Sequence, residues 1–146
     1  MKKSPTIKRV KPLNPYRVRV TWSNGQVATL DLADAITRSR SLSLLRDVAL
    51  FNKVKPGEWG HSIRWTDDIE LGAESLWRRT LAAIGRRDAM QFMDWRMRHS
   101  LSLSQAAQEL GLSRRMVAYY ESGLHKVPKT VLLACEGWEA RHDRAA

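Results

Sequence analysis

Residues 101–128 constrain the fold of this chain more than any other segment, because their residue types suit one mechanical task. Small and apolar residues recur at helical spacing on both sides of Gly111. At that point a helix must end and the chain must turn sharply, and glycine adopts the positive φ required there without steric cost. The pattern predicts two short helices, 103–110 and 114–122, that cross at a tight turn and bury their facing surfaces.

Helical periodicity continues on both sides of this segment. It predicts a helix over 88–98 before it and another over 129–140 after it, the second with Val131, Leu132, Cys135 and Trp138 on one stripe. That stripe fits either the core or a dimer interface, and the core is favoured.

A change of pattern near residue 85 separates these helices from the rest of the chain. A further helix is expected over 73–84, and the polar residues 85–88 interrupt the helical pattern behind it. We therefore predict two domains, 1–84 and 85–146.

The first domain is predicted to be a mixture of strands and helices. Residues 16–22 and 26–32 alternate between polar and apolar side chains around a turn that contains Gly25, which is typical of a β-hairpin. An edge strand is expected over 7–10, ended by Pro12 and Pro15. The other expected elements are short helices over 32–37 and 44–52, the second capped by Asp47, and strands over 53–55 and 61–65, with Trp59 and Trp65 in the core. The fold class is α+β, with an all-α second domain.

The composition indicates a folded protein with a polyanionic partner. The chain has 146 residues, is 43% hydrophobic and carries a formal net charge of +10. No apolar run approaches the ~20 residues that span a bilayer, and no segment has the pattern of a signal peptide. We expect a cytoplasmic location. Cys135 has no second cysteine to pair with and is interpreted as a core residue.

Basic residues are concentrated near the beginning of the chain. Residues 1–84 contain 15 Lys and Arg against 8 Asp and Glu, and the first 19 residues contain no acid. A flexible basic arm that contacts DNA phosphates would explain this pattern, but the exposed face of a strand explains it as well and is favoured. The basic residues concerned are Lys2, Lys3, Lys8, Arg9, Lys11, Arg17 and Arg19.

Residues 1–80 resemble a family of small bacterial domains of unknown function, which occur alone or fused to a helix-turn-helix. The resemblance lies in residues 20–25 (VTWSNG), 31–32, 45–47, 50–51, 63–65 and 69–71, with Leu76. It implies a strand-rich α+β module with a regulatory or antitoxin-like role. Residues 66–68 (TDD) depart from the glycine-containing turn that the family often has there.

Residues 88–140 resemble the lambda-repressor-like helix-turn-helix family. Ser102 and Gln105 form a capping-box pattern at the start of the second helix, and Ser113 is a candidate cap for the third. The resemblance implies that Arg96 pairs with Glu121 as a structural tie. It also implies that the third helix reads the major groove of double-stranded DNA.

The resemblance and the residue types together give a set of expected DNA contacts. Arginine side chains at the start of the reading helix can bind guanine in a bidentate fork, and a tyrosine one turn on can stack or bind phosphate. The family usually has glutamine at the first position of the second helix, where this chain has Leu103. The expected base contacts are Arg114, Arg115 and Tyr119, and the expected backbone contacts are Ser102, Gln105, Ser113, Ser122, Lys126 and Lys129.

A cluster of titratable residues raises the alternative of an enzyme. His61, Asp67, Asp68 and Glu70 lie within ten residues of one another, and such groups can bind a metal or transfer protons. Neighbouring residues of a strand point to opposite faces, so convergence of the two aspartates is not expected. We expect no enzyme activity, no cofactor and no metal site.

The leading hypothesis is a sequence-specific transcriptional regulator that binds DNA as a homodimer. Its first domain would sense a signal or bind a protein partner. The alternative is a protein-interaction module or antitoxin in which the helix-turn-helix is only a scaffold.

Overall fold

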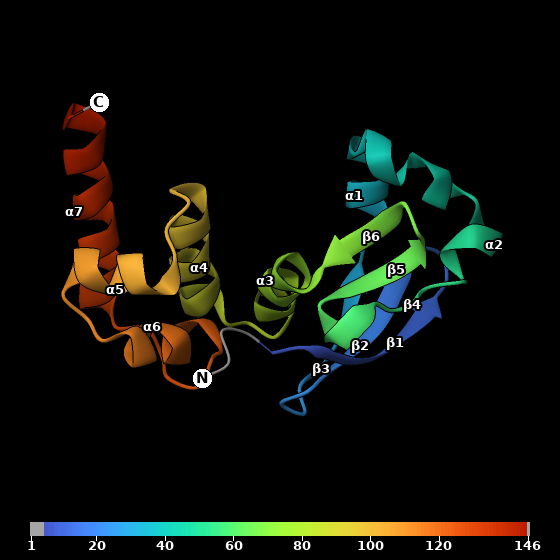
Figure 1. Cartoon of the computed structure of the whole chain (residues 1–146), viewed down its shortest axis with the longest axis horizontal. Helices are drawn as coiled ribbons and strands as arrows, with labels where there is room; N and C mark the ends of the chain where they lie inside the picture. The colour runs from blue at the N-terminus through green and yellow to red at the C-terminus, as the bar shows by residue number, and fades with distance from the viewer. Residues whose placement is uncertain (1–4, 146) are drawn as a thin grey trace. The chain divides into compact units, whose positions relative to one another are not determined.

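The computed structural model describes residues 5–145 (Figure 1). The chain divides into two compact units between Ile84 and Gly85, and each is described here by itself. We call residues 5–84 the N-terminal unit and the residues from Gly85 on the C-terminal unit. Strands occupy much of the first and helices the second, so the mixed α+β class is confirmed. Among residues 5–145, no helix has the length and apolar character needed to cross a membrane.

An antiparallel sheet of three strands begins the N-terminal unit, with the order β1(Ile7–Leu13), β2(Arg17–Trp22), β3(Val27–Asp31). The predicted alternation of buried and outward-facing residues is present in β2. Val18, Val20 and Trp22 are fully buried, whereas the residues between them face outward. The predicted end of the first strand was wrong, because β1 continues through Pro12, which pairs with Val18. β1 is an edge strand of this sheet, where a residue without an N–H group is tolerated.

Short helical segments connect this sheet to a second one. They are α1(Ala33–Arg38), the 3₁₀ segment η1(Arg40–Arg46) and α2(Val48–Phe51), and a further 3₁₀ segment, η2(Glu58–Gly60), lies between the first two strands of the second sheet. The predicted helix over 44–52 was too long. Asp47 caps α2 as expected, with its side chain accepting a hydrogen bond from the backbone N–H of Ala49. The cap itself interrupts the helix, because an N-cap residue has extended backbone angles.

The second sheet is antiparallel, with the order β4(Lys55–Pro56), β5(Ser62–Thr66), β6(Ile69–Gly72). The strand predicted over 53–55 was misplaced by about two residues. The sequence did not predict β6, because only four residues lie between the turn at 67–68 and α3(Ala73–Ala83).

Indole side chains organise the core of the N-terminal unit. Trp22 and Trp77 pack edge to face with ring centroids 5.0 Å apart, and the Trp22 N–H donates to the Thr80 hydroxyl at 3.0 Å. Trp65 is buried as predicted and donates to the Phe51 carbonyl. Trp59 was wrongly assigned to the core: its side chain is 85% exposed and its φ is +60°.

The position of Trp59 follows from the glycines beside it. A Cβ on Gly60 would lie 2.5 Å from the carbonyl oxygen of Ile7, and one on Gly57 would overlap the Ser62 hydroxyl. The backbone of this turn therefore packs directly against neighbouring segments at Gly57 and Gly60, while the Trp59 side chain faces the solvent.

Four helices form the C-terminal unit over residues 85–145. They are α4(Arg87–Arg98), α5(Leu103–Leu110), α6(Arg114–Glu121) and α7(Lys129–Ala145), the last longer than predicted. Phe92, Trp95, Val117 and Tyr120 are among the buried residues of their common core. Cys135 lies in this core as predicted, and its burial, with Glu139 nearby, raises the pKa of its thiol to about 12. Val131, Leu132 and Trp138 pack against the same core.

Candidate nucleic-acid interface

A three-residue turn joins α5 to α6 and depends on one glycine. Gly111 ends α5 with φ of +70°, and the N–H of Leu112 behind it donates to the carbonyl of Ala107 at 2.9 Å. Apart from the adjoining chain, no heavy atom of the described residues lies within 4 Å of the position that a Cβ on Gly111 would take. Glycine is therefore favoured here by its backbone angles and not by lack of space.

Both helices of the α5–α6 pair begin with a side-chain cap. The Ser102 hydroxyl oxygen accepts from the backbone N–H of Gln105, and the Gln105 side-chain oxygen accepts from that of Ser102, which completes the predicted capping box. The Ser113 hydroxyl accepts from the N–H of Met116 at 3.1 Å. This capping leaves the hydroxyl hydrogen of Ser102 and the NH₂ group of Gln105 as donors on an exposed surface.

The start of α6 carries two arginines without internal partners. Arg115 is exposed and Arg114 is half-buried, and neither forms an ion pair or a side-chain hydrogen bond within the described part of the chain. The buried residues of α6 are Val117, Ala118, Tyr120 and Glu121. By helical spacing Arg115 and Tyr119 lie on the other side of the helix, whereas Arg114 shares the face of Ala118 and is half-buried in the first turn.

Tyr119 lies one turn further along the same helix and is half-buried. Its ring packs edge to face on His125 with centroids 5.0 Å apart, while its carbonyl accepts from the N–H groups of Leu124 and His125. Ser122, the C-cap of α6, donates its hydroxyl to that carbonyl as well. Lys126, in the loop between α6 and α7, and Lys129, the first residue of α7, are both exposed.

Arg96 of α4 pairs with Glu121 of α6, as predicted. The guanidinium Nε and Nη2 donate to the two carboxylate oxygens at 2.5 and 2.8 Å, and Nη1 donates to the carbonyl of Leu101 at 2.9 Å. The Arg96 side chain is 10% exposed and that of Glu121 is 3% exposed. A pair so well buried ties α4 to the end of α6 and to the segment that precedes α5.

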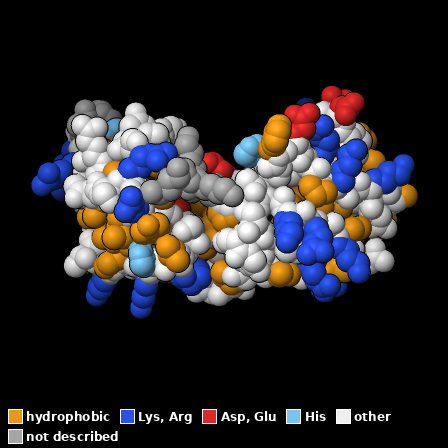
Figure 2. Space-filling view, turned by 60° about the horizontal axis from the view of Figure 1, so that its bottom comes forward, with side chains coloured by type: hydrophobic (Ala, Val, Ile, Leu, Met, Phe, Trp, Pro, Cys, Tyr) orange, Lys and Arg blue, Asp and Glu red, His pale blue; other side chains and the backbone are white. Residues whose placement is uncertain are grey.

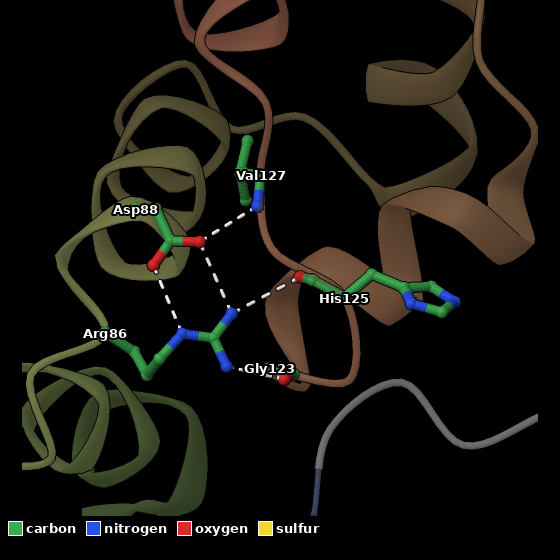
Figure 3. Close-up of polar contacts among 5 residues, drawn as sticks. All are labelled: Arg86, Asp88, Gly123, His125 and Val127. Atoms are coloured by element: carbon green, nitrogen blue, oxygen red, sulfur yellow. Dashed lines mark hydrogen bonds and ion pairs between the residues drawn. The ribbon is translucent and has the colours of Figure 1, made fainter.

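Sequence reasoning missed a second polar tie, which holds the loop behind α6 (Figure 3). Arg86 donates to the carbonyls of Gly123 at 2.6 Å and His125 at 3.3 Å, and Asp88 accepts from the N–H of Val127 at 2.9 Å. The two side chains also pair with each other, with Nε 3.2 Å from the carboxylate. We refer to this arrangement as the Arg86–Asp88 tie.

The electrostatics of Asp88 reflect these contacts. Burial alone would raise the pKa of the carboxyl, but hydrogen bonds from Arg86 and from the N–H groups of Val127 and Ala89, with the charge of Arg86, outweigh burial and hold the pKa below its ordinary value. A sign of these contacts in the sequence is an acidic residue in the first turn of a helix, immediately after a basic residue. Residues 85–88 were interpreted only as a helix breaker.

Leu103 occupies the position where the resemblance would place a glutamine that binds phosphate. Its side chain is 5% exposed and belongs to the buried core of the C-terminal unit. The first position of α5 therefore contributes apolar packing and no polar group to the surface.

The titratable residues of the N-terminal unit do not converge on one site. Asp67 and Asp68 lie on an exposed turn, and His61 is exposed beside β5. Glu70 accepts from the Ser62 hydroxyl at 3.0 Å and pairs with Arg64 at 3.4 Å. Among the residues described, no three His, Cys, Asp or Glu side chains are placed to hold a metal ion.

Comparison with known proteins gives one family and one similar solved structure. The model of the family "Protein of unknown function (DUF2442)" matches residues 7–81. A crystal structure named "Putative DNA Binding Protein NE0471" from Nitrosomonas europaea is 37% identical, with a TM-score of 0.70. The similarity covers 96% of this chain and 91% of that one. No curated protein matches the chain. By the match over residues 7–81, which include both sheets and most of α3, this chain belongs to the DUF2442 family.

Proposed function

We propose that this protein binds double-stranded DNA sequence-specifically through a lambda-repressor-like helix-turn-helix formed by α5 and α6, and regulates transcription. The observation that carries the proposal is the pair of arginines without internal partners, Arg114 and Arg115, in the first turn of a helix that core packing holds in place. The name of the Nitrosomonas europaea protein supports a DNA partner.

The chemistry of the two arginines suits base recognition in the major groove. A guanidinium can donate two hydrogen bonds to O6 and N7 of guanine, and each such pair contributes about 1–3 kcal/mol of discrimination. Tyr119 would add a stacking or phosphate contact. The backbone contacts expected of Ser102, Gln105, Ser113, Ser122, Lys126 and Lys129 would fix the position of the module on the duplex.

One reading helix covers only a few base pairs, so we propose a homodimer on a pseudo-palindrome. Its half-sites would lie about one helical turn, or ~34 Å, apart. The N-terminal unit would bind a protein partner or a signal, and the protein would act in the cytoplasm without enzyme activity, cofactor or metal.

The test is fluorescence anisotropy with fragments of the source genome in competition with unrelated DNA at ~150 mM salt. The wild type should prefer particular fragments, and a dimer should bind two chains per duplex. Arg114→Ala with Arg115→Ala should abolish the preference, whereas the matched control Arg141→Ala with Arg144→Ala, on exposed positions of α7, should keep it. If the wild type shows no preference, the scaffold alternative, in which α5 and α6 serve only protein contact, replaces this proposal.

A further inference from the structure

One face of the first sheet carries a set of basic side chains that the proposed reading helix does not use. The buried residues of β2 alternate with Arg17, Arg19 and Thr21, which point to the other side of the sheet. Strand register places Arg9 of β1 opposite Thr21 and Lys11 opposite Arg19. We call this surface the outer face of β1–β3. Its outward positions are Arg9, Lys11, Leu13, Arg17, Arg19, Thr21, Val27, Thr29 and Asp31.

Most cations on the outer face of β1–β3 have no acid opposite them. Within residues 5–144, none of its Lys or Arg side chains forms an ion pair. Asp31 lies opposite Arg17 and offsets part of its charge, although its carboxylate accepts a hydrogen bond from the N–H of Ala33 and forms no ion pair. Lys11 and Arg19 are direct cross-strand neighbours, an arrangement of like charges that destabilises a sheet. In Figure 2, Lys and Arg side chains gather over one side of the N-terminal unit.

The residues between these cations indicate which part of a nucleic acid they suit. The outward positions of the three strands include no aromatic side chain, so this face lacks the stacking platform on which single-stranded bases are bound. Thr21 and Thr29 add hydroxyl groups, which donate to phosphate oxygens. Residues two apart along a strand are separated by about 7 Å, so the cations form a regular array on a stiff surface.

We propose that the outer face of β1–β3 binds the phosphate backbone of duplex DNA without reading its sequence. This inference rests on the proposed function, because it adds a second contact to DNA that α6 would hold. Such a contact supplies affinity through the release of counterions. It would compensate for the loss of a phosphate contact at position 103 of the C-terminal unit, where the side chain of Leu103 is buried.

The experiment measures how salt weakens binding of the full chain to a fluorescein-labelled duplex of random sequence. Each phosphate contact contributes about 0.9 to the slope of log K against log salt. Lys11→Gln with Arg19→Gln should therefore lower that slope by about 2. Between ~50 and ~200 mM salt, the wild type should lose roughly tenfold more affinity than this variant.

The matched control removes the same charge from another part of the same unit. Arg38→Gln with Arg40→Gln changes two exposed residues of α1 and η1 and should leave the slope within about 0.5 of the wild-type value. Circular dichroism should show that both variants keep the wild-type secondary structure. Equal slopes for the sheet variant and the control would overturn the proposal, as would tighter binding of the wild type to phosphatidylserine vesicles than to DNA with the same dependence on Lys11 and Arg19.

The outcome separates this proposal from the proposed function. If the wild type selects particular fragments and the sheet variant keeps the full slope, the outer face of β1–β3 does not contact DNA while the reading helix does. If the wild type selects no fragment and the sheet variant still loses slope, the sheet contact is supported and sequence-specific regulation is not.

Discussion

In the C-terminal unit several arginines are paired with carboxylates, whereas the cations described on the outer face of β1–β3 in the N-terminal unit form no ion pair. Arg86, Arg96 and Arg98 each contact a carboxylate, those of Asp88, Glu121 and Glu139. The N-terminal unit pairs Arg64 with Glu70 in its second sheet, but beneath its basic outer face it buries neutral hydrogen bonds, such as that from Trp22 to Thr80.

The difference follows from how each unit makes its core. Two sheets and the indoles of the N-terminal unit bury a large apolar surface, so its charges can remain outside. The α5–α6 pair consists of two eight-residue helices, which are marginal alone and depend on tertiary contacts. A basic residue in this chain is therefore a candidate for DNA binding only where the fold does not use it, as at Arg114 and Arg115.

The largest expected effect concerns the buried ion pair. Glu121→Ala should destabilise the C-terminal unit by about 3–5 kcal/mol, because it leaves the Arg96 guanidinium buried and uncompensated. Hydrogen exchange of the amides in α4 and α6 measures the stability of the C-terminal unit separately from that of the N-terminal unit.

Two controls make this result specific. Arg96→Met with Glu121→Leu removes both charges and should recover most of the loss. Glu136→Ala, at an exposed position of α7, should change stability by no more than about 0.5 kcal/mol. If Glu121→Ala costs no more than Glu136→Ala, the contrast between paired and unpaired charges is wrong.

A smaller effect is expected at the Arg86–Asp88 tie. Asp88→Asn should cost about 1–3 kcal/mol at pH 7, since it weakens a charge-assisted contact to Arg86 and to the N–H of Val127. The pKa of Asp88 is lowered in the folded chain, so the stability from its charge is complete above the unfolded pKa of about 3.9 and is lost as the pH falls through the folded value.

The difference between wild type and Asp88→Asn should therefore shrink as the pH falls below about 4. Urea denaturation at a series of pH values measures it. Asp143→Asn, an exposed change on α7, should show no such dependence. A difference that stays constant down to the lowest pH would mean that the charge of Asp88 does not stabilise the loop.

The smallest effect should have the opposite sign. Lys11→Gln with Arg19→Gln removes a like-charge pair from neighbouring strands and should stabilise the N-terminal unit by about 0.2–1 kcal/mol. Urea denaturation at low salt detects this, and the gain should decrease as salt is added. A loss of stability would mean that these side chains support the sheet by packing, and the charge contrast would then be weaker.

Local rules made much of the fold predictable from the sequence. Alternation around Gly25 and helical periodicity around Gly111 depend on nearby residues alone, and so do the caps at Asp47, Ser102 and Ser113. The pairing of Arg96 with Glu121 came from a family resemblance, since the residues are 25 positions apart.

The errors arise where tertiary contacts decide the outcome. Trp59 is apolar enough for a core, but it lies in a turn whose glycines pack their backbone on Ile7 and Ser62, and its indole faces the solvent. The partners of Arg86 are carbonyl groups at Gly123 and His125, which no side-chain pattern reveals.

The Arg86–Asp88 tie also links the first residues of the C-terminal unit to the loop that follows α6. Arg86 lies two residues after Ile84, the last residue of the N-terminal unit. A change in the backbone at residues 84–86 would reach residues 123–127 directly through these three hydrogen bonds. The loop beside Tyr119 therefore depends on the backbone at the very start of the C-terminal unit as well as on the core of that unit.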